Sequence, residues 1–360
     1  MAKLYTEHYN NEKLLAAKDK NGDDPAFRIV CSAERGPGKT YSFSKTLIQR
    51  FLETGDKFIL LTRHKGDIGA IAAGIMDGYL VQEMPEYTVC EKSQMKDTFA
   101  RVYLSHIEKD ENDKDKMVSE ECGYVIPINS ADKIKKISSL FYDAWCFYFD
   151  EFQPFSDSYL KDEVDLLYNI YKSIARGEGH ATRYMPVFMV SNTISLGNPY
   201  FTAFDLNKHI QSNTKFYRGE GVVFERCEVD GLADEHARTP IDRALKVHKE
   251  RKGNNLWVMD NNSLVSKPDC WGRGYYICTV EYEGCKFGLV DYPLIGYKYA
   301  TRKIDRFCQY YYNATKKTGA LNLPLIQNSG VFIDLRKRFF EGNVRCQDGG
   351  LQEILINILA

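Results

Sequence analysis

Short apolar runs alternate with amphipathic stretches through the first half of the chain. Four runs are typical of buried strands: FRIVCSA at 27–33, KFILLTR at 57–63, CFYF at 146–149 and PVFMVSN at 186–192. Between them, apolar residues recur at helical spacing over 40–53 and 162–175. Strands that alternate with helices predict an α/β fold in which a mainly parallel sheet is covered on both faces.

Three further segments depart from this alternation. Residues 100–105 and 123–128 predict the arms of a hairpin whose tip, EKDENDKDK, is highly charged. Residues 220–252 are charged and weakly patterned, which is typical of a linker or a small subdomain. The stretch 275–291 predicts two alternating strands around a Glu-Gly turn, and it opens a second α/β or α+β unit. We therefore expect three parts, at 1–212, 213–260 and 261–360.

Composition restricts the class of protein without naming a function. The chain has 360 residues and a net charge of −1, which argues against a protein that coats nucleic acid. No apolar stretch reaches the roughly 18 to 20 residues that span a bilayer, and the polar N-terminus lacks a signal peptide. The 10 cysteines are scattered without C-x-x-C pairs. We expect reduced thiols and no structural zinc.

Charge is distributed unevenly along the chain. From Ile241 onward Lys and Arg exceed Asp and Glu by 6, whereas the preceding residues carry a net charge of −7. A more basic C-terminal third is typical of a separate domain with an anionic partner. An uneven scatter of solvated surface charge explains the same count, and the sequence leaves both interpretations open.

The first candidate for chemistry is the loop CSAERGPGKT at 31–40. It ends as a phosphate-binding loop does, in Gly38-Lys39-Thr40, but Ala33 stands where the pattern G-x-x-x-x-G-K-[ST] begins with glycine. The loop lies between a predicted strand and a predicted helix, so backbone N–H groups would point at one anion. Lys39 would reach the β- and γ-phosphates, and the Thr40 hydroxyl would help to hold Mg²⁺. The alternative is a glycine-rich turn before an amphipathic helix.

A second motif strengthens the nucleotide interpretation. The run CFYFDEF places Asp150 and Glu151 directly after a buried strand. In P-loop ATPases such an aspartate holds Mg²⁺, and the following glutamate polarises the attacking water. A lone acidic pair would more simply be a solvated strand end or a helix cap. Both motifs in this order on buried strands predict an ATP site, and the glutamate argues against a small-molecule kinase.

Two more polar positions have both a functional and a structural explanation. Ser191 and Asn192 end the strand at 186–192, where a polar side chain can contact the γ-phosphate or simply cap the strand. Arg176 ends a helix just before Gly177, where arginine favours the helix dipole and glycine caps the C-terminus. The functional alternative for Arg176 is an arginine finger donated to the ATP of a neighbouring subunit. The residues alone do not choose.

Three strings together carry a resemblance to a known family. They are R-G-x-G-K-T from Arg35 to Thr40, FDEF at 149–152, and S-N-x-x-S-x-x-N-P-Y-F from Ser191 to Phe201. The sequence resembles the genome-packaging (DNA-encapsidation) ATPases of short-tailed, protein-primed phages of the phi-twenty-nine type, which are relatives of the large terminases. The match covers roughly residues 9–201 and is looser beyond 213.

The resemblance implies a fold for each of the three parts. Residues 1–212 would form a P-loop ATPase domain of the additional-strand, catalytic-glutamate (ASCE) type, followed by a linker at 213–260. Residues 261–360 would resemble a ribonuclease-H-type nuclease that has lost its metal-binding acids and binds nucleic acid or the capsid. Glu281, Asp291 and Asp334 are available there, but they form no obvious cluster.

The resemblance also implies roles for individual residues. Glu151, Arg176, Lys39 and Arg35 would be catalytic, with Arg176 reaching the next subunit and Arg35 registering the state of the nucleotide. Thr40 and Asp150 would hold Mg²⁺. A lysine before the Asp150 strand is also implicated in such rings, with Lys133, Lys135 and Lys136 as candidates. The residues expected to bind ATP are Gly36, Gly38, Lys39, Thr40, Tyr41, Asp150, Asn192 and Lys135.

The implied function is that of a genome-packaging motor subunit. A homo-oligomeric ring of five subunits would hydrolyse ATP at the portal of an empty capsid and draw double-stranded DNA inward, with a capsid-bound RNA as scaffold. It would act in the host cytoplasm, transiently at the portal vertex, without a membrane and outside the mature virion. The alternatives are a large terminase with an active C-terminal nuclease, or a nucleotide-binding scaffold protein that moves no DNA.

Overall fold

The computed structural model divides the chain into two compact units. Unit 1 comprises Met1–Thr193 and Lys215–Lys252, and unit 2 comprises Ile194–Thr214 and Gly253–Ala360. The structure describes residues 8–32, 36–109, 113–154, 159–176, 182–192, 198–210, 214–227, 229, 272–315, 329–340 and 343–359.

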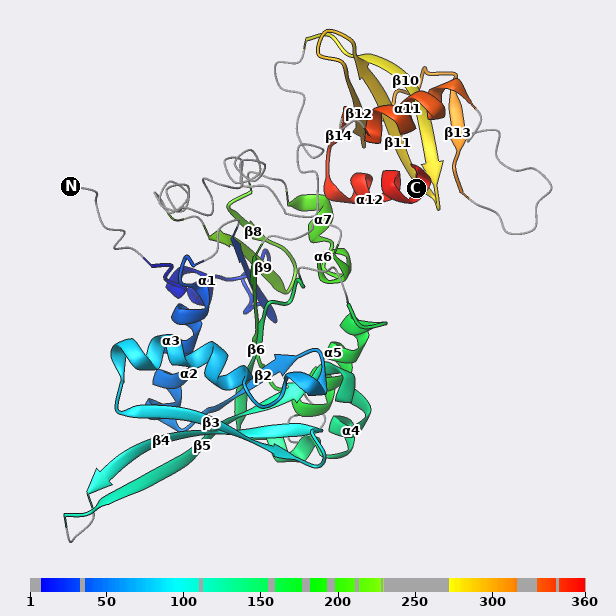
Figure 1. Cartoon of the computed structure of the whole chain (residues 1–360). Coiled ribbons are helices and arrows are strands. Elements are labelled where there is room, and N and C mark those ends of the chain that lie inside the picture. Colours follow the sequence, from blue (N-terminus) through cyan, green and yellow to red (C-terminus); the bar gives the residue numbers. More distant parts are fainter. Residues whose placement is uncertain are drawn as a thin grey trace, which may run out of the picture. The chain divides into compact units, whose positions relative to one another are not determined.

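A nine-stranded sheet with the order β3-β4-β5-β2-β6-β7-β1-β9-β8 organises unit 1 (Figure 1). The strands are β1 (Phe27–Ser32), β2 (Lys57–Thr62), β3 (Tyr87–Gln94), β4 (Phe99–Lys109), β5 (Asp115–Pro127), β6 (Ala144–Asp150), β7 (Val187–Asn192), β8 (Phe216–Arg218) and β9 (Val222–Cys227). The six strands from β5 to β9 in this order pair in parallel, and β3, β4 and β8 add antiparallel edges. The predicted mainly parallel sheet is therefore confirmed.

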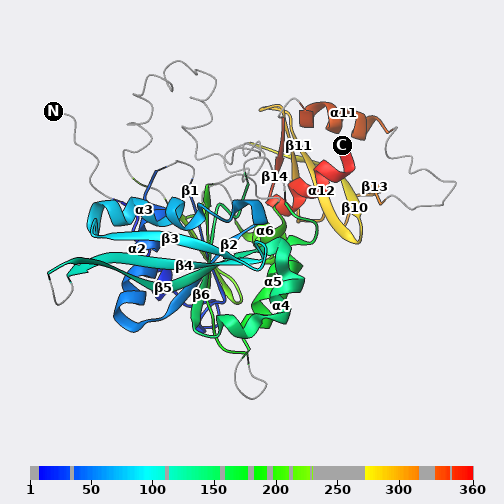
Figure 2. The same ribbon diagram turned by 60° about the horizontal axis from the view of Figure 1, so that its bottom comes forward.

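Helices cover both faces of this sheet (Figure 2). They are α1 (Glu12–Ala16), α2 (Lys39–Thr54), α3 (Ile71–Glu83), α4 (Ala131–Lys136) and α5 (Glu163–Ile174). Helices α2 and α3 lie on one face and α4 and α5 on the other, where Tyr171 of α5 packs 5.7 Å from Phe147 of β6, measured between ring centroids. Among the described residues, no helix combines the length and the apolar character that crossing a bilayer requires.

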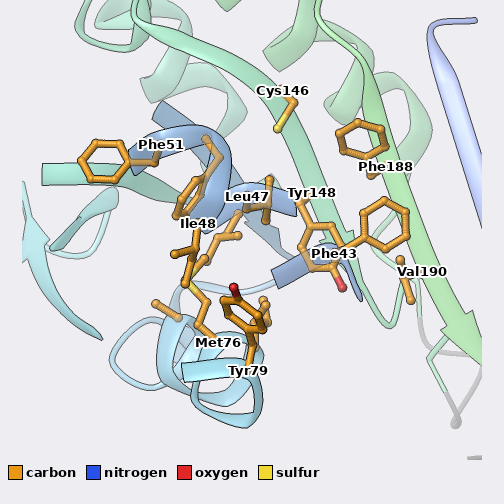
Figure 3. Close-up of a cluster of buried hydrophobic side chains, with 14 of the residues drawn as sticks. Phe43, Leu47, Ile48, Phe51, Met76, Tyr79, Cys146, Tyr148, Phe188 and Val190 are labelled. Atoms are coloured by element: carbon orange, nitrogen blue, oxygen red, sulfur yellow. The ribbon is translucent and has the colours of Figure 1, made fainter. Parts of the chain in front are cut away.

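The apolar face of α2 explains why this helix docks beside the sheet (Figure 3). Phe43 lies 5.5 Å from Tyr148 of β6 and 5.3 Å from Phe188 of β7, and all three rings are buried. Met76 and Tyr79 of α3 close the layer from the other side of α2. The core thus fixes α2, whose first turn follows the glycine-rich loop, against the two strands that carry the other motifs.

The predicted hairpin is present as β4 and β5, which pair in antiparallel register from Ala100↔Val125 to Lys109↔Asp115. β5 continues inward to pair in parallel with β2. Gly123 makes this approach possible, because a Cβ atom there would lie 2.6 Å from the carbonyl oxygen of Phe58. The hairpin is therefore part of the main sheet.

The expected domain boundary between residues 212 and 213 is wrong, because elements on each side of it belong to the other unit. β9, in the segment expected to be a linker, pairs in parallel with β1 over its whole length, from Phe27↔Val222 to Ser32↔Cys227. All six of its residues are buried, because it completes the sheet beyond β1. Conversely, α6 (Pro199–Ala203) and α7 (Leu206–His209) group with unit 2. Helix α7 contacts α12 there, and Asn207 Nδ2 donates to Glu353 Oε2 at 3.3 Å.

Unit 2 contains a five-stranded mixed sheet with the order β13-β10-β11-β12-β14. Its elements are β10 (Tyr275–Tyr282), β11 (Cys285–Tyr292), β12 (Tyr297–Thr301), β13 (Tyr311–Asn313), α11 (Gly330–Phe340), β14 (Val344–Cys346) and α12 (Gly349–Leu359). The predicted Glu-Gly turn is confirmed, because Glu283 and Gly284, with φ of +47° and +82°, join β10 to β11. Leu335 and Leu355 from the two helices share one buried cluster with the sheet.

Candidate functional site

The glycine-rich loop leads from the carboxyl end of β1 into the first turn of α2. Gly38 is the N-cap of α2 with φ of +91°, a left-handed conformation that glycine adopts without a Cβ penalty. Its carbonyl accepts the first helical bond, from Ser42 N at 2.9 Å. The helix N-terminus therefore opens toward the loop, as anion binding requires. Ala33 and Arg35 lie outside the described residues, so the role of Arg35 stays a prediction.

The ammonium group of Lys39 is buried at the carboxyl edge of the sheet. Its side chain donates from Nζ to Ser32 Oγ at the end of β1 and to Asn192 Oδ1 at the end of β7, the latter at 3.3 Å. Only 6% of Lys39 is exposed, and burial lowers the pKa of its ammonium group. A partly desolvated ammonium group with neutral partners is suited to compensating an incoming phosphate charge.

A direct hydrogen bond joins the two sequence motifs. Thr40 Oγ1 donates to Asp150 Oδ2 at 3.0 Å, although the residues lie 110 positions apart. Asp150 ends β6, and β7 lies between β6 and β1, so three strand ends converge on the start of α2. The other carboxylate oxygen, Oδ1, accepts from the backbone N–H of Glu151 at 3.0 Å. The predicted proximity of Lys39, Thr40, Asp150 and Asn192 is present in the structure.

Burial raises the pKa of Asp150 to about 6, although bonds from Thr40 and from the Glu151 backbone oppose the shift. We therefore expect Asp150→Asn to stabilise the nucleotide-free protein above pH 6, by about 1 to 3 kcal/mol because the carboxylate retains some solvent contact. The pKa of Asp150 in the folded protein is higher than its ordinary value of 3.8, so folding takes up a proton between pH 3.8 and pH 6. The gain in stability from Asp150→Asn therefore shrinks as the pH falls from 6 to 3.8. Urea unfolding in EDTA across this pH range measures the difference in the free energy of unfolding between the variant and the wild type. A difference that does not change with pH would contradict the prediction.

Glu151 follows in a tight turn. Its φ is +49°, which is unusual for a residue with a side chain, and Glu151 is exposed. The turn is held from outside the motif: Arg63, which directly follows β2, donates from Nη1 to the Glu151 carbonyl oxygen at 3.0 Å. The role of Arg63 could not be predicted from the sequence, because an arginine after a buried strand gives no sign of which carbonyl groups it will contact.

A cavity of about 620 Å³ collects most of the expected site residues. Those that line it are Gly36, Gly38, Lys39, Thr40, Tyr41, Asp150, Glu151, Ser191 and Asn192. A second group of lining residues was not predicted from the sequence; it comprises His8, Ala70 and, from one side of α3, Ile71, Gly74, Ile75, Gly78 and Gln82. The sequence feature that could have indicated this group is the pair of glycines at helical spacing in α3. Glycines lower helix propensity, however, and do not by themselves indicate a binding site.

The donor set at the end of β6 fits a magnesium ion that is completed by its nucleotide. Thr40 and Asp150 offer hydroxyl and carboxylate oxygens, the ligand type that Mg²⁺ prefers. Across the described part of the chain, no group of three His, Cys, Asp or Glu side chains could hold a metal by itself. Mg²⁺ usually keeps several waters and takes phosphate oxygens as its other ligands, so two protein ligands suffice.

Comparison with known sequences decides the family. The family profile described as Podovirus DNA encapsidation protein (Gp16) matches residues 4–355. The chain belongs to this Gp16 family. The DNA packaging proteins of Bacillus phages phi29 and PZA are each 23% identical to it over 353 residues, with 96% of this chain and 95% of each relative covered. Family membership confirms the predicted role in viral genome packaging.

A solved structure extends the likeness to the fold. A chain of the bacteriophage Phi-29 viral genome packaging motor assembly superposes with a TM-score of 0.57 at 20% sequence identity. The match covers 99% of this chain and 100% of that one. At this identity the likeness shows the fold alone, and it includes both units of the Gp16-family chain.

Two of the expected site residues, Arg176 and Lys135, lie outside the cavity lining in this Gp16-family protein. Arg176 follows the C-cap of α5, is exposed, and forms an isolated bridge with Thr182. Lys135 lies on α4 and is also exposed, as are Lys133 and Lys136. The nearby Lys133 side chain lowers the pKa of Lys65. Action of Arg176 or of these lysines on a neighbouring subunit stays a prediction.

Proposed function

We propose that this Gp16-family chain is the ATP-hydrolysing subunit of a ring that translocates double-stranded DNA into a procapsid. The observation that carries the proposal is the Thr40–Asp150 hydrogen bond of 3.0 Å, which joins the phosphate loop to the acidic pair. Family membership supports the packaging role, and the 620 Å³ cavity supports a nucleotide as the fuel.

The strand order supports assignment of the ATPase unit to the ASCE type. β7 lies between β1, which leads into the phosphate loop, and β6, which ends in Asp150. This additional strand brings Asn192 between Lys39 and the acidic pair. One bound molecule at this edge of the sheet could therefore contact the ammonium group of Lys39, the oxygen ligands of Thr40 and Asp150, the carboxylate of Glu151 and the amide of Asn192.

The polar side chains of the loop and of the strand ends then each have a role in hydrolysis. Lys39 and the N-terminus of α2 bind and orient the phosphates, and Asn192 lies where the loss of the terminal phosphate changes its contacts. Thr40 and Asp150 would hold Mg²⁺, which supplies charge compensation at the phosphates when bound. Glu151 accepts the proton of the attacking water. Arg35 would register the state of the nucleotide from within the loop.

The proposal places part of the catalytic machinery on the neighbouring subunit. Arg176 is exposed at the end of α5 and does not line the cavity of its own chain, which suits a finger that acts in trans. A lysine among Lys133, Lys135 and Lys136 would act similarly. Hydrolysis at subunit interfaces requires a ring, for which we propose five subunits.

For the second unit we propose a vestigial ribonuclease-H-like domain that binds and does not cut. Asp291 and Asp334 both contact Lys298 Nζ, at 3.6 and 2.9 Å, and Glu281 lies 3.7 Å from Lys286. Carboxylates that pair with lysines are poorly placed to converge on two metal ions. Packaging RNA, the portal and DNA are the proposed partners, and the host cytoplasm is the proposed site of action.

Mixing of variant subunits tests the role of Arg176. We expect Arg176→Ala and Lys39→Ala rings each to lose most ATP turnover, and mixed rings to regain part of it, because some interfaces then combine an intact Lys39 with an intact neighbouring Arg176. Mixing Lys39→Ala with Glu151→Gln is the matched control, since both changes damage the same site and should give no recovery. Absence of recovery in the first mixture as well would favour a purely helix-capping Arg176.

The whole proposal is tested by packaging in vitro. Purified protein, procapsids, packaging RNA and double-stranded DNA are combined, and ATP turnover is measured together with the DNA that becomes resistant to nuclease. We expect turnover that depends on all components and protected DNA that requires ATP. ATP turnover that does not depend on DNA, together with the absence of nuclease-resistant DNA, would favour the scaffold alternative. Metal-dependent cutting of plasmid DNA would favour an active terminase nuclease.

A further inference from the structure

Arg63 occupies a junction between three elements of unit 1. From the end of β2, its Nε donates to Glu163 Oε2 at 3.1 Å, and its Nη1 donates to the carbonyl oxygen of Glu151 at 3.0 Å. Its Nη2 donates to the carbonyl oxygen of Phe152. One guanidinium group therefore joins β2, the turn after β6 and the first residue of α5.

The ion pair between Arg63 and Glu163 within this junction is almost fully removed from solvent. The side chain of Arg63 is 11% exposed and that of Glu163 is 0% exposed. Glu163 Oε2 also accepts from Leu160 N at 2.8 Å, and the Arg63 guanidinium lies 5.0 Å from the ring centroid of Phe149. Replacing a buried ion pair by apolar residues is often neutral or stabilising, so stability alone is a weak reason for this one.

The backbone that the guanidinium holds belongs to the water-activating residue. Glu151 has φ of +49°, a conformation that a residue with a Cβ adopts only when its surroundings impose it. Asp150 Oδ1 holds the Glu151 N–H, and the Val190 carbonyl accepts from Phe152 N at 3.2 Å. Arg63 adds two further constraints, on the carbonyl groups of Glu151 and Phe152.

Glu163 gives Arg63 a rigid support. It is the first residue of α5, whose Leu167, Ile170 and Ile174 are buried. A planar guanidinium held on one side by a helix can keep two carbonyl groups on its other side at fixed positions. Lysine at the same place would keep the charge but would lose this fork geometry.

We propose that Arg63, supported by Glu163, is a positioning residue that fixes the turn of Glu151 and so presents its carboxylate to the attacking water. The proposal rests on the proposed function, in which Glu151 is the general base. It gives Arg63 no contact with the nucleotide, consistent with its absence from the residues that line the cavity. A misplaced base slows proton transfer without weakening substrate binding, because binding depends on Lys39, Thr40 and the loop.

The test combines Arg63→Lys and Glu163→Gln with steady-state turnover and with nucleotide binding measured by calorimetry. We expect kcat to fall about 10- to 100-fold in Arg63→Lys while the dissociation constant of ATP changes less than twofold. The double variant should be no slower than the worse single variant, because both act through the same turn. Arg50→Lys is the matched control: Arg50 pairs with Asp56 at 2.8 Å on the surface and should keep wild-type turnover.

The decisive readout is the effect of Arg63→Lys in a Glu151→Gln background. If Arg63 acts only by positioning Glu151, the substitution should change the residual turnover less than twofold there. A 10-fold loss in both backgrounds, or a parallel loss of binding and melting temperature, would overturn the proposal in favour of a general structural role. Wild-type turnover in Arg63→Lys would overturn only the positioning role of Arg63. Wild-type turnover in Glu151→Gln would overturn the proposed function itself.

Discussion

Replacing Glu151 with glutamine should lower ATP turnover by about 10²- to 10⁴-fold while leaving ATP bound. The amide keeps the size and the hydrogen-bonding reach of the carboxylate but cannot accept a proton from water. Nucleotide binding should persist because Lys39, Thr40 and the N-terminus of α2 are unchanged. Turnover measured by phosphate release, together with calorimetric binding of ATP in the presence of Mg²⁺, checks both parts.

The same substitution at a remote surface position isolates the chemistry from the change in charge. Glu86 is exposed, lies in the turn before β3 and does not line the cavity, so Glu86→Gln should behave as wild type. A bound but uncleaved ATP would also hold a packaging ring stalled on DNA, which nuclease protection can detect. Wild-type turnover in Glu151→Gln would remove the general base from the proposed mechanism and leave Asp150 as the nearest carboxylate.

The residues of the candidate site whose proximity could be predicted from the sequence are those encoded in local motifs. Gly38, Lys39 and Thr40 belong to one turn, and the helical spacing after them is set by residues such as Phe43 that pack on the sheet. The acidic pair is equally local, since Asp150 ends an apolar strand. A buried parallel strand aligns its carboxyl end with those of its neighbours, so two local motifs suffice to predict one shared site.

The parts that sequence missed depend on contacts between distant segments. β9 has only six residues, and it becomes a core strand because β1 offers it a partner nearly 200 positions earlier. Helix α3 contains Gly74 and Gly78, which lower helix propensity, and its packing against α2 outweighs that cost. Arg63 gives the same lesson for the site, because its three acceptors come from segments about 90 to 100 residues away.

Lys39→Met should weaken ATP binding by about 10²- to 10³-fold, the effect of removing one partner from a desolvated charge pair. The same change should raise the free energy of unfolding of the nucleotide-free protein at pH 7. Burial lowers the pKa of Lys39 below its ordinary 10.5, so the folded state bears a penalty for the ammonium charge that methionine removes. This penalty fades as the pH rises from the lowered folded-state pKa of Lys39 through 10.5, above which the wild-type side chain is neutral in both states.

Binding and stability therefore should move in opposite directions at this one position, which separates a functional lysine from a structural one. Lys45, exposed on the same helix and outside the cavity lining, supplies the matched control, because Lys45→Met should leave both quantities nearly unchanged. Calorimetric binding of ATP and urea unfolding at pH 7 and at pH 10 measure the two effects. A loss of stability together with a loss of binding would contradict the assignment, since it would mean that the bonds to Ser32 and Asn192 outweigh the cost of burying the charge.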